Sequence, residues 1–327
     1  MSPATLHLAL AAFLLLPLRV SAQQPAFGPL GTSERNPVYE LFYVPIPEGA
    51  DVLARSRTRA DVAFAYSNIF ESREGDALQE YFDLERLTTT VTVRRGMGRG
   101  WELGGRISFQ TNWAGFLDPL IQGLHGAFNL PNGDREQVPN GQYGLVLWDS
   151  DGEVLLRVPE RRFGPEDVQL FAKWAVRAGE GSALSLRATV ELPTGVEGTG
   201  TGRGDLGVEA LWRRSWTRWH LHALSGVSTL NAPAWARPWT RSAAFYALIA
   251  GERSLGSVAL LAQLAGSSPY LVGAGVSELD HAATLLTLGV AGTRGVWRWQ
   301  VGFVEDVPPN SPSVDFTVHV QFTRISR

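Results

Sequence analysis

Hydrophobic and polar residues alternate with a period of two from about residue 57 to the end of the chain. In residues 184–192, for example, Leu, Ala and Val alternate with Ser, Arg, Thr and Glu. The same pattern runs through residues 168–176, 206–212, 297–303 and 314–322. Alternation of this kind is typical of strands with one apolar and one polar face. About twelve such stretches occur, each close to the roughly 9–11 residues that a tilted strand needs to cross a bilayer. The pattern therefore predicts an all-β protein.

The breaks between these stretches alternate strictly between short and long. Short breaks fall at residues 95–100, 178–182, 214–218, 252–256 and 292–295. Longer connections fall at residues 68–77, 113–165, 193–203, 231–239, 266–279 and 306–312. Bacterial outer-membrane barrels have short periplasmic turns and long external loops, whereas a soluble β-sandwich has no reason to keep this order. Because unpaired edge amides are not tolerated in lipid, we expect a closed, transmembrane, antiparallel up-and-down β-barrel of about twelve strands. The last strand, near residues 314–322, should pair with the first, near residues 58–68.

The amino-acid composition further narrows the possible location, partners and chemistry of the chain. The 11 Trp residues include clusters at Trp212, Trp216 and Trp219 and at Trp235 and Trp239, which favour aromatic girdles at the two membrane interfaces. The formal net charge of −3 gives no indication of a nucleic-acid partner. With 0 Cys, disulfides, thiolate nucleophiles and Cys-based zinc sites are excluded.

The N-terminal residues lie outside the strand pattern. Residues 1–22 combine an apolar run with Val-Ser-Ala before a cleavage point, which predicts a signal peptide and hence export. Residues 23–56 are rich in Pro and Gly and form either a periplasmic tail or a plug in the lumen. Val38, Leu41 and Phe42 make this segment too apolar for an ordinary solvated tail. Residues 57–327 are the barrel, placed in the outer membrane of a Gram-negative bacterium with both mature termini in the periplasm.

The longest connection, residues 113–165, has structure of its own. Its first part has apolar residues at helical spacing, and its later part predicts a β-hairpin that turns at Ser150, Asp151 and Gly152. Long structured loops are usually functional, so this extracellular loop is expected to restrict the lumen. Its candidate residues are His125, Asn132, Asp134 and Arg135.

The polar faces of the strands predict the residues that line the lumen. These candidates for a constriction are Lys173, Arg187, Glu191, Glu209, Arg213, His220, His222, Asp315 and His319, and Arg177 falls on the same face. Counting back from the turns puts Arg187 opposite Glu209 and near Lys173, where opposite charges can pair between strands. Two interpretations remain open: a buried network that stabilises the barrel, or a mixed-charge constriction for a solute.

The sequence gives only weak support for a metal site or for enzymatic activity. His220 and His222 share a strand face, but two ligands do not make a metal site, so no metal or cofactor is expected. A lipid hydrolase needs an activated Ser beside a His. The nearest Ser, Ser225, falls on the opposite strand face from both His residues. The glycines of residues 198–205 lack the Lys-Ser/Thr ending of a phosphate-binding loop.

Three stretches resemble known families. Residues 35–50, RNPVYELFYVPIPEGA, and residues 124–143, with a Leu-His-x-x-Phe-x-Leu-Pro-Asn-Gly pattern, resemble a Gram-negative outer-membrane family known only as a domain of unknown function. Residues 188–212 are similar to the outer-membrane barrels encoded with phenol meta-cleavage pathways, which are regarded as channels for hydrophobic substrates. The resemblance implies a barrel in the outer membrane and supplies no catalytic residue.

These observations predict a passive channel for small solutes, hydrophobic or aromatic ones among them. The alternatives are a closed barrel with a structural or surface-recognition role and, less favoured, an outer-membrane lipid hydrolase. The expected partners are outer-membrane lipid, an unidentified solute and, through the C-terminal strand, the barrel-assembly machinery. That strand continues past Phe322 to Arg327, unlike the terminal Phe or Tyr common in such barrels.

Overall fold

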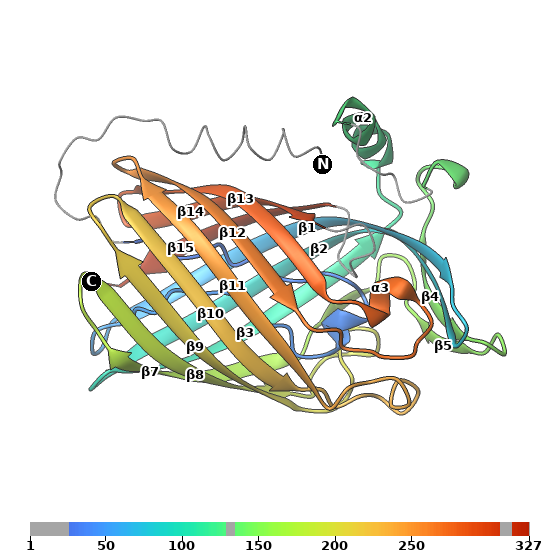
Figure 1. Ribbon diagram of the computed structural model, residues 1–327, viewed down its shortest axis with the longest axis horizontal. Coiled ribbons are helices and arrows are strands. Elements are labelled where there is room, and N and C mark those ends of the chain that lie inside the picture. The colour runs from blue at the N-terminus through green and yellow to red at the C-terminus, as the bar shows by residue number, and fades with distance from the viewer. Residues whose placement is uncertain (1–25, 129–134, 308–315, 327) are drawn as a thin grey trace.

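A closed antiparallel barrel of twelve strands makes up most of this computed structural model, which describes residues 26–128, 135–307 and 316–326 (Figure 1). The wall strands are β1 (Thr58–Glu74), β2 (Leu78–Gly98), β3 (Trp101–Trp113), β7 (Val168–Arg177), β8 (Ser182–Leu192), β9 (Asp205–Ser215), β10 (Trp219–Thr229), β11 (Ala243–Ser254), β12 (Val258–Ser267), β13 (Ala283–Arg294), β14 (Trp297–Asp306) and β15 (Phe316–Ile325). They pair in chain order, and β15 closes the barrel on β1 with a register from Arg59–Ile325 to Asn68–Phe316. The predicted fold class and the predicted pairing of the last strand with the first are confirmed.

The two faces of the wall differ as the alternation predicts. Along β15, Thr317, His319 and Gln321 are buried inside the barrel, whereas Phe322 on the other face is 45% exposed. Other large exposed apolar side chains around the wall include Phe64, Val93, Leu103, Leu170, Leu186, Val208, Phe245, Ile249, Leu264, Leu288 and Phe303. An apolar outer face over a polar interior is what a barrel surrounded by lipid requires.

The two ends of the barrel differ in their connections. At one end, called here the turn end, turns of two to four residues join β2 to β3, β7 to β8, β9 to β10, β11 to β12 and β13 to β14. All five lie at the predicted short breaks. The opposite end, called the loop end, carries the longer connections, with α2, α3, β4 and β5 on the right of Figure 1.

The prediction of one long connection is wrong. Residues 68–77 were expected to be a long connection, but β1 continues to Glu74 and β2 begins at Leu78. Residues 69–84, called here the outer hairpin, extend beyond the neighbouring strands, since β15 pairs with β1 only as far as Asn68 and β3 pairs with β2 only from Glu85. The extension is stabilised by its own pairing and by β4 (Gly144–Asp149), which pairs with residues 78–83.

The remaining elements lie in the connections at the loop end. Between β3 and β7 are α2 (Asp118–Phe128), the short 3-10 helix η2 (Arg135–Gln137), the hairpin β4–β5 (Val154–Arg157) and β6 (Phe163–Pro165). The connection from β12 to β13 contains α3 (Ser277–Asp280). No helix within the described residues is long and apolar enough to cross a membrane.

Residues 26–56, called here the lumenal segment, run through the interior of the barrel and back. The backbone N–H of Phe27 donates to Glu252 near the turn end, and the 3-10 helix η1 (Tyr39–Leu41) reaches the loop end, where the Tyr39 hydroxyl donates to the Leu279 carbonyl. The chain then returns toward the turn end, and the N–H of Leu53 donates to Glu102, the second residue of β3. The segment therefore enters and leaves through the same end of the barrel.

Candidate functional site

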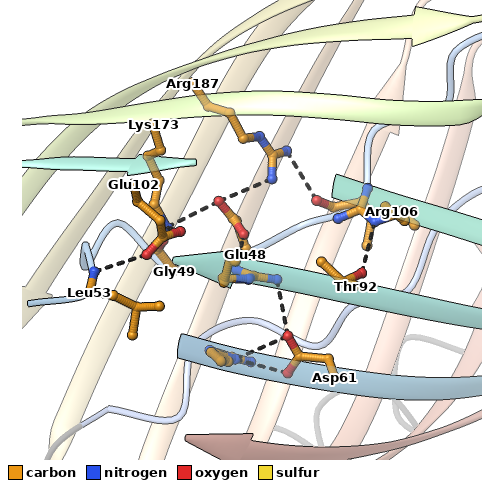
Figure 2. Close-up of polar contacts among 12 residues, drawn as sticks. Glu48, Gly49, Leu53, Asp61, Thr92, Glu102, Arg106, Lys173 and Arg187 are labelled. Atoms are coloured by element: carbon orange, nitrogen blue, oxygen red, sulfur yellow. Dashed lines mark hydrogen bonds and ion pairs between the residues drawn. The ribbon is translucent and has the colours of Figure 1, made fainter. Parts of the chain in front are cut away.

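The lumen is occupied at mid-height by a carboxylate of the lumenal segment. Glu48 lies between cations from three wall strands: Arg94 of β2, Lys173 of β7 at 3.1 Å and Arg187 of β8 at 3.2 Å (Figure 2). The Glu48 side chain is buried. A carboxylate buried this deeply is stable only when it is paired, so these three cations hold it in place.

Wall carboxylates complete this set of charges. Glu209 pairs with Arg187, Glu102 pairs with Lys173 at 3.1 Å, and Asp61 pairs with Arg94 at 3.3 Å. Arg59 also pairs with Asp61, at 2.8 Å. These side chains and Glu48 are called here the central network, which balances four cations against four carboxylates only while Glu48 is in place.

The network has a further cation beside it. The Arg106 guanidinium of β3 donates to Gln169 Oε1 at 2.9 Å and to Thr92 Oγ1 at 3.3 Å. Without Glu48, the wall at this level would present five cationic side chains and three carboxylates. The lumenal segment therefore supplies charge that the wall itself lacks.

The loop end is closed by an apolar cluster, called here the cap. It joins the top of the lumenal segment to the outer hairpin, to β4–β5 and to the loops after β10 and β12. Its buried members include Val38, Tyr39, Leu41, Phe42, Ile69, Leu78, Phe82, Leu145, Leu147, Leu230, Tyr270 and Leu279. Tyr39 and Tyr270 stack with ring centroids 4.3 Å apart, and the Tyr270 hydroxyl donates to the Tyr43 carbonyl at 3.2 Å. Among the described residues, the cap is the largest cluster of buried apolar side chains, and the aromatic stacking adds to its stability.

The turn end is open. A cavity of about 780 Å³ lies between the two limbs of the lumenal segment and the wall, lined in part by Asp51, Lys173, Arg213 and Arg298. Cavities beside the segment higher in the lumen have volumes of only about 30 to 50 Å³. A cavity of about 780 Å³ is in the range of small-molecule sites, but the segment blocks its continuation toward the loop end.

Apart from Arg177, the predicted lumen residues that the structure describes lie inside the barrel. Lys173, Arg187 and Glu209 meet in the central network. Arg213 faces the cavity at the turn end and pairs with Asp51 at 2.9 Å. Glu191 lies nearer the loop end, where it accepts a hydrogen bond from Gln169 at 3.0 Å.

The three lumen histidines are not gathered into one site. His220 Nδ1 lies 2.8 Å from Ser215 Oγ, and His222 Nε2 lies 3.2 Å from Glu252 Oε2. His319 lies on β15, where it lines a small cavity together with Glu48 and Arg94. Ser225 is exposed on the outer face, so it pairs with neither His220 nor His222. Asp315 lies outside the described residues.

Two expectations change on inspection of the structure. Arg177 was placed in the lumen, but a bulge between Ala175 and Arg177 breaks the alternation and leaves Arg177 exposed. Of the loop candidates, Arg135 is buried and binds Asn68, Asp83 and Asp118, so it anchors the loop to the outer hairpin. His125 falls in α2, while Asn132 and Asp134 lie outside the described residues, as do residues 1–22.

Several residues of the central network were not predicted from the sequence. Asp61, Arg94 and Glu102 follow the same alternation as their strand neighbours, so the signal for them was present in β1, β2 and β3. Glu48 gave a weaker signal: it is a single acidic residue in a Pro-rich, apolar stretch, and no periodicity indicates where it lies.

The fold and the filled lumen define the class of protein: a twelve-stranded barrel of the outer-membrane type, with a polar interior occupied by its own N-terminal segment. The chain belongs to the DUF3187 family, described as "Protein of unknown function", whose profile matches residues 5–324. No curated protein matches the sequence.

Solved outer-membrane barrels resemble this chain at low sequence identity. The COG4313 outer-membrane channel from Pseudomonas putida F1 has a TM-score of 0.56 and 12% identity, with 86% of this chain and 100% of that chain covered. The NanC porin has a TM-score of 0.43 and 8% identity, with 82% and 98% covered. The first similarity supports the fold; at this identity neither carries residue roles over to this chain.

Proposed function

We propose that the protein is a passive outer-membrane channel that its lumenal segment closes and that opens when this segment moves out through the turn end. The observation that carries the proposal is the path of residues 26–56, which enter and leave through that end. In outer-membrane barrels the end with short turns faces the periplasm, so the segment would withdraw into the periplasm. No wall strand has to separate from its neighbour for this movement.

The contacts of the segment favour reversible closure. Within the described residues, no wall strand pairs with residues 26–53, which are held by side chains such as Glu48, Gln263 and Glu252. Water and ions can replace ion pairs and side-chain hydrogen bonds when a lumen fills with solvent. The apolar cap supplies the larger part of the cost of opening, because Val38, Tyr39 and Phe42 must leave it.

The charges at mid-height favour small anionic solutes. When Glu48 leaves, its cationic partners face the lumen, and a carboxylate on a solute can take its place. A purely hydrophobic solute, as the resemblance to meta-cleavage barrels implies, would meet charged groups at this level and lose more in desolvation. The solute class we propose is therefore a small organic anion, which an aromatic ring on the solute does not exclude.

The test is conductance of the mature chain in planar bilayers, compared with a variant that lacks residues 26–52. We expect rare openings of the full chain and a persistently open, larger conductance of the deletion variant. A folded deletion variant that conducts no better than the full chain would contradict the proposal.

A reversible form of this conductance test uses the complete chain. The chain has 0 Cys, so cysteines replacing Gly31 and Gln321 would be unique; a Cβ at Gly31 would lie 3.0 Å from Gln321 Oε1. Joining them with a disulfide or a short thiol crosslinker should abolish openings, and reduction or the uncrosslinked state should restore them. Each single-cysteine variant is the control.

A second function is favoured by a different observation. The balanced central network and the apolar cap together fill the lumen as a permanent core would, which suits a closed barrel with a structural or surface-recognition role. In that case crosslinking would change nothing, because no openings would exist to abolish.

A further inference from the structure

Three buried carboxylates meet at the loop end, away from the lumenal segment's ion pairs. Glu71 of β1 and Glu80 of β2 belong to the outer hairpin, and Glu278 belongs to α3 in the connection from β12 to β13. One oxygen from each lies within 4.8 Å of the other two. All three side chains are buried.

The surroundings of Glu80 indicate that this cluster of carboxylates lacks a positively charged group. Its side chain is only 2% exposed, and neither carboxylate oxygen has a hydrogen-bond partner among the described residues. An unpartnered buried carboxylate is costly, so the geometry of this side chain indicates a missing positive group.

Arg73 supplies only part of the positive charge. Its Nε donates to Glu278 Oε1 at 2.6 Å, and its Nη2 lies 3.9 Å from Glu71 Oε2. Counted over these four described groups alone, three carboxylates and one guanidinium carry two net negative charges when all are ionised. A single divalent cation matches that excess.

The backbone holds the ligands in position without the cation. Gly75 and Gly275 cross so closely that a Cβ on Gly75 would lie 2.5 Å from the Gly275 carbonyl. The N–H of Leu78 donates to the Ala274 carbonyl at 2.9 Å, which fixes the outer hairpin against this connection. The site is therefore assembled from two segments that are remote in sequence and already in contact.

We propose that Glu71, Glu80 and Glu278 bind one Ca²⁺ ion that clamps the outer hairpin to the β12–β13 connection. Ca²⁺ takes six to eight oxygen ligands at roughly 2.3–2.6 Å in irregular geometry, so oxygens up to about 5 Å apart can share one ion. Mg²⁺ demands a smaller and nearly octahedral set of ligands, which three carboxylates on separate elements are less suited to provide. The site is independent of channel activity, and its consequence is a firmer cap.

The test uses the mature chain, refolded in detergent micelles without lipopolysaccharide and freed of metal with a chelator that is then removed. Titration calorimetry with CaCl2 should show saturable binding of one ion per chain. Glu80→Gln and Glu278→Gln should each weaken binding by about tenfold or more, because each removes a charged ligand. Glu80→Gln removes an unpartnered carboxylate, and Glu278→Gln keeps a carbonyl acceptor for Arg73 while losing their ion pair, so both should stay folded, as heat-modifiable migration on gels can verify.

Glu74→Gln is the matched control, since Glu74 is an exposed carboxylate on the same hairpin and its loss changes the net charge equally. It should bind Ca²⁺ as the unmodified chain does. Absence of saturable Ca²⁺ binding to the unmodified chain would overturn the proposal and make Glu80 a buried protonated acid. Equal binding by Glu80→Gln, or tighter binding of Mg²⁺ from MgCl2, would also overturn it.

Discussion

A single charged side chain inside the lumen strongly affects the stability of the closed state, because the interior offers little water to solvate it. Glu48 is the clearest case: it is the only member of the central network that belongs to the lumenal segment rather than to the wall. Its partners Arg94, Lys173 and Arg187 come from three strands. The same carboxylate therefore neutralises the wall and fastens the segment.

Glu48→Gln tests this dual role. Breaking a buried ion pair by removing one partner typically costs about 3–5 kcal/mol, and each 1.4 kcal/mol changes an equilibrium about tenfold. We expect the docked state of the segment to lose enough free energy to raise the open fraction in single-channel recordings by at least about tenfold.

The matched control is Asp51→Asn, which removes a carboxylate of the same segment that is largely exposed and pairs with Arg213 in the open cavity. Exposed pairs contribute little, so its open fraction should change far less. An equal effect of the two variants would contradict the central role of Glu48.

At the scale of elements, the wall strands could be predicted, whereas the segment inside them could be predicted only as one of two alternatives, a periplasmic tail or a plug in the lumen. Alternation assigns each wall residue to a face, and the observed registers confirm that Arg187 lies opposite Glu209 and beside Lys173. The alternation fails where the local geometry departs from a regular strand, as at the bulge before Arg177. Residues 26–53 have no period and, within the described residues, pair with no wall strand, so their three-dimensional contacts are needed to show that they run up and back through the lumen.

The outer hairpin also could not be predicted from the pattern of the sequence. Its residues 69–77 carry charges and a Gly that indicate a loop, yet pairing along β1 and β2 and contact with β4 extend the strands through them. Long-range contacts, here with the Gly275 backbone, decide its conformation. The proximity of Glu80 to Glu278 follows from that contact and has no signal in the sequence around either residue.

Two glycines of the β12–β13 connection allow this contact to be tested as an element-level interaction. Gly273 and Gly275 both have positive φ, of 71° and 77°, so Ala costs about 1 kcal/mol of backbone strain at either position. Only at Gly275 does a Cβ meet a neighbour, the Asp76 nitrogen at 2.5 Å; at Gly273 nothing lies within 4 Å. Gly275→Ala should therefore separate the connection from the outer hairpin, and Gly273→Ala should not.

The measurement is limited proteolysis of the loop end together with Ca²⁺ affinity. Gly275→Ala should be cleaved several times faster within residues 268–282 and should bind Ca²⁺ more weakly than Gly273→Ala. Equal behaviour of the two variants would show that backbone strain alone, and not the crossing of the two segments, accounts for the effect.

For the whole molecule, the arrangement of charge predicts the selectivity of the open state. With the lumenal segment removed, the wall at mid-height presents an excess of cations over carboxylates, with Arg106 among the cations. A ring of excess positive charge in a narrow pore favours anions. The variant lacking residues 26–52 should therefore show a reversal potential of the sign expected for Cl⁻ preference over K⁺ in a KCl gradient.

Arg106→Gln in that variant separates the contribution of the lumen from that of the net charge. Arg106 donates to neutral Gln169 and Thr92, so its replacement removes a lumen charge without stranding a carboxylate partner. Arg177→Gln removes the same charge from the exposed side of β7. We expect Arg106→Gln to move the reversal potential toward zero and Arg177→Gln to leave it unchanged. If both variants shifted it equally, selectivity would arise from the overall charge of the barrel instead of from its constriction.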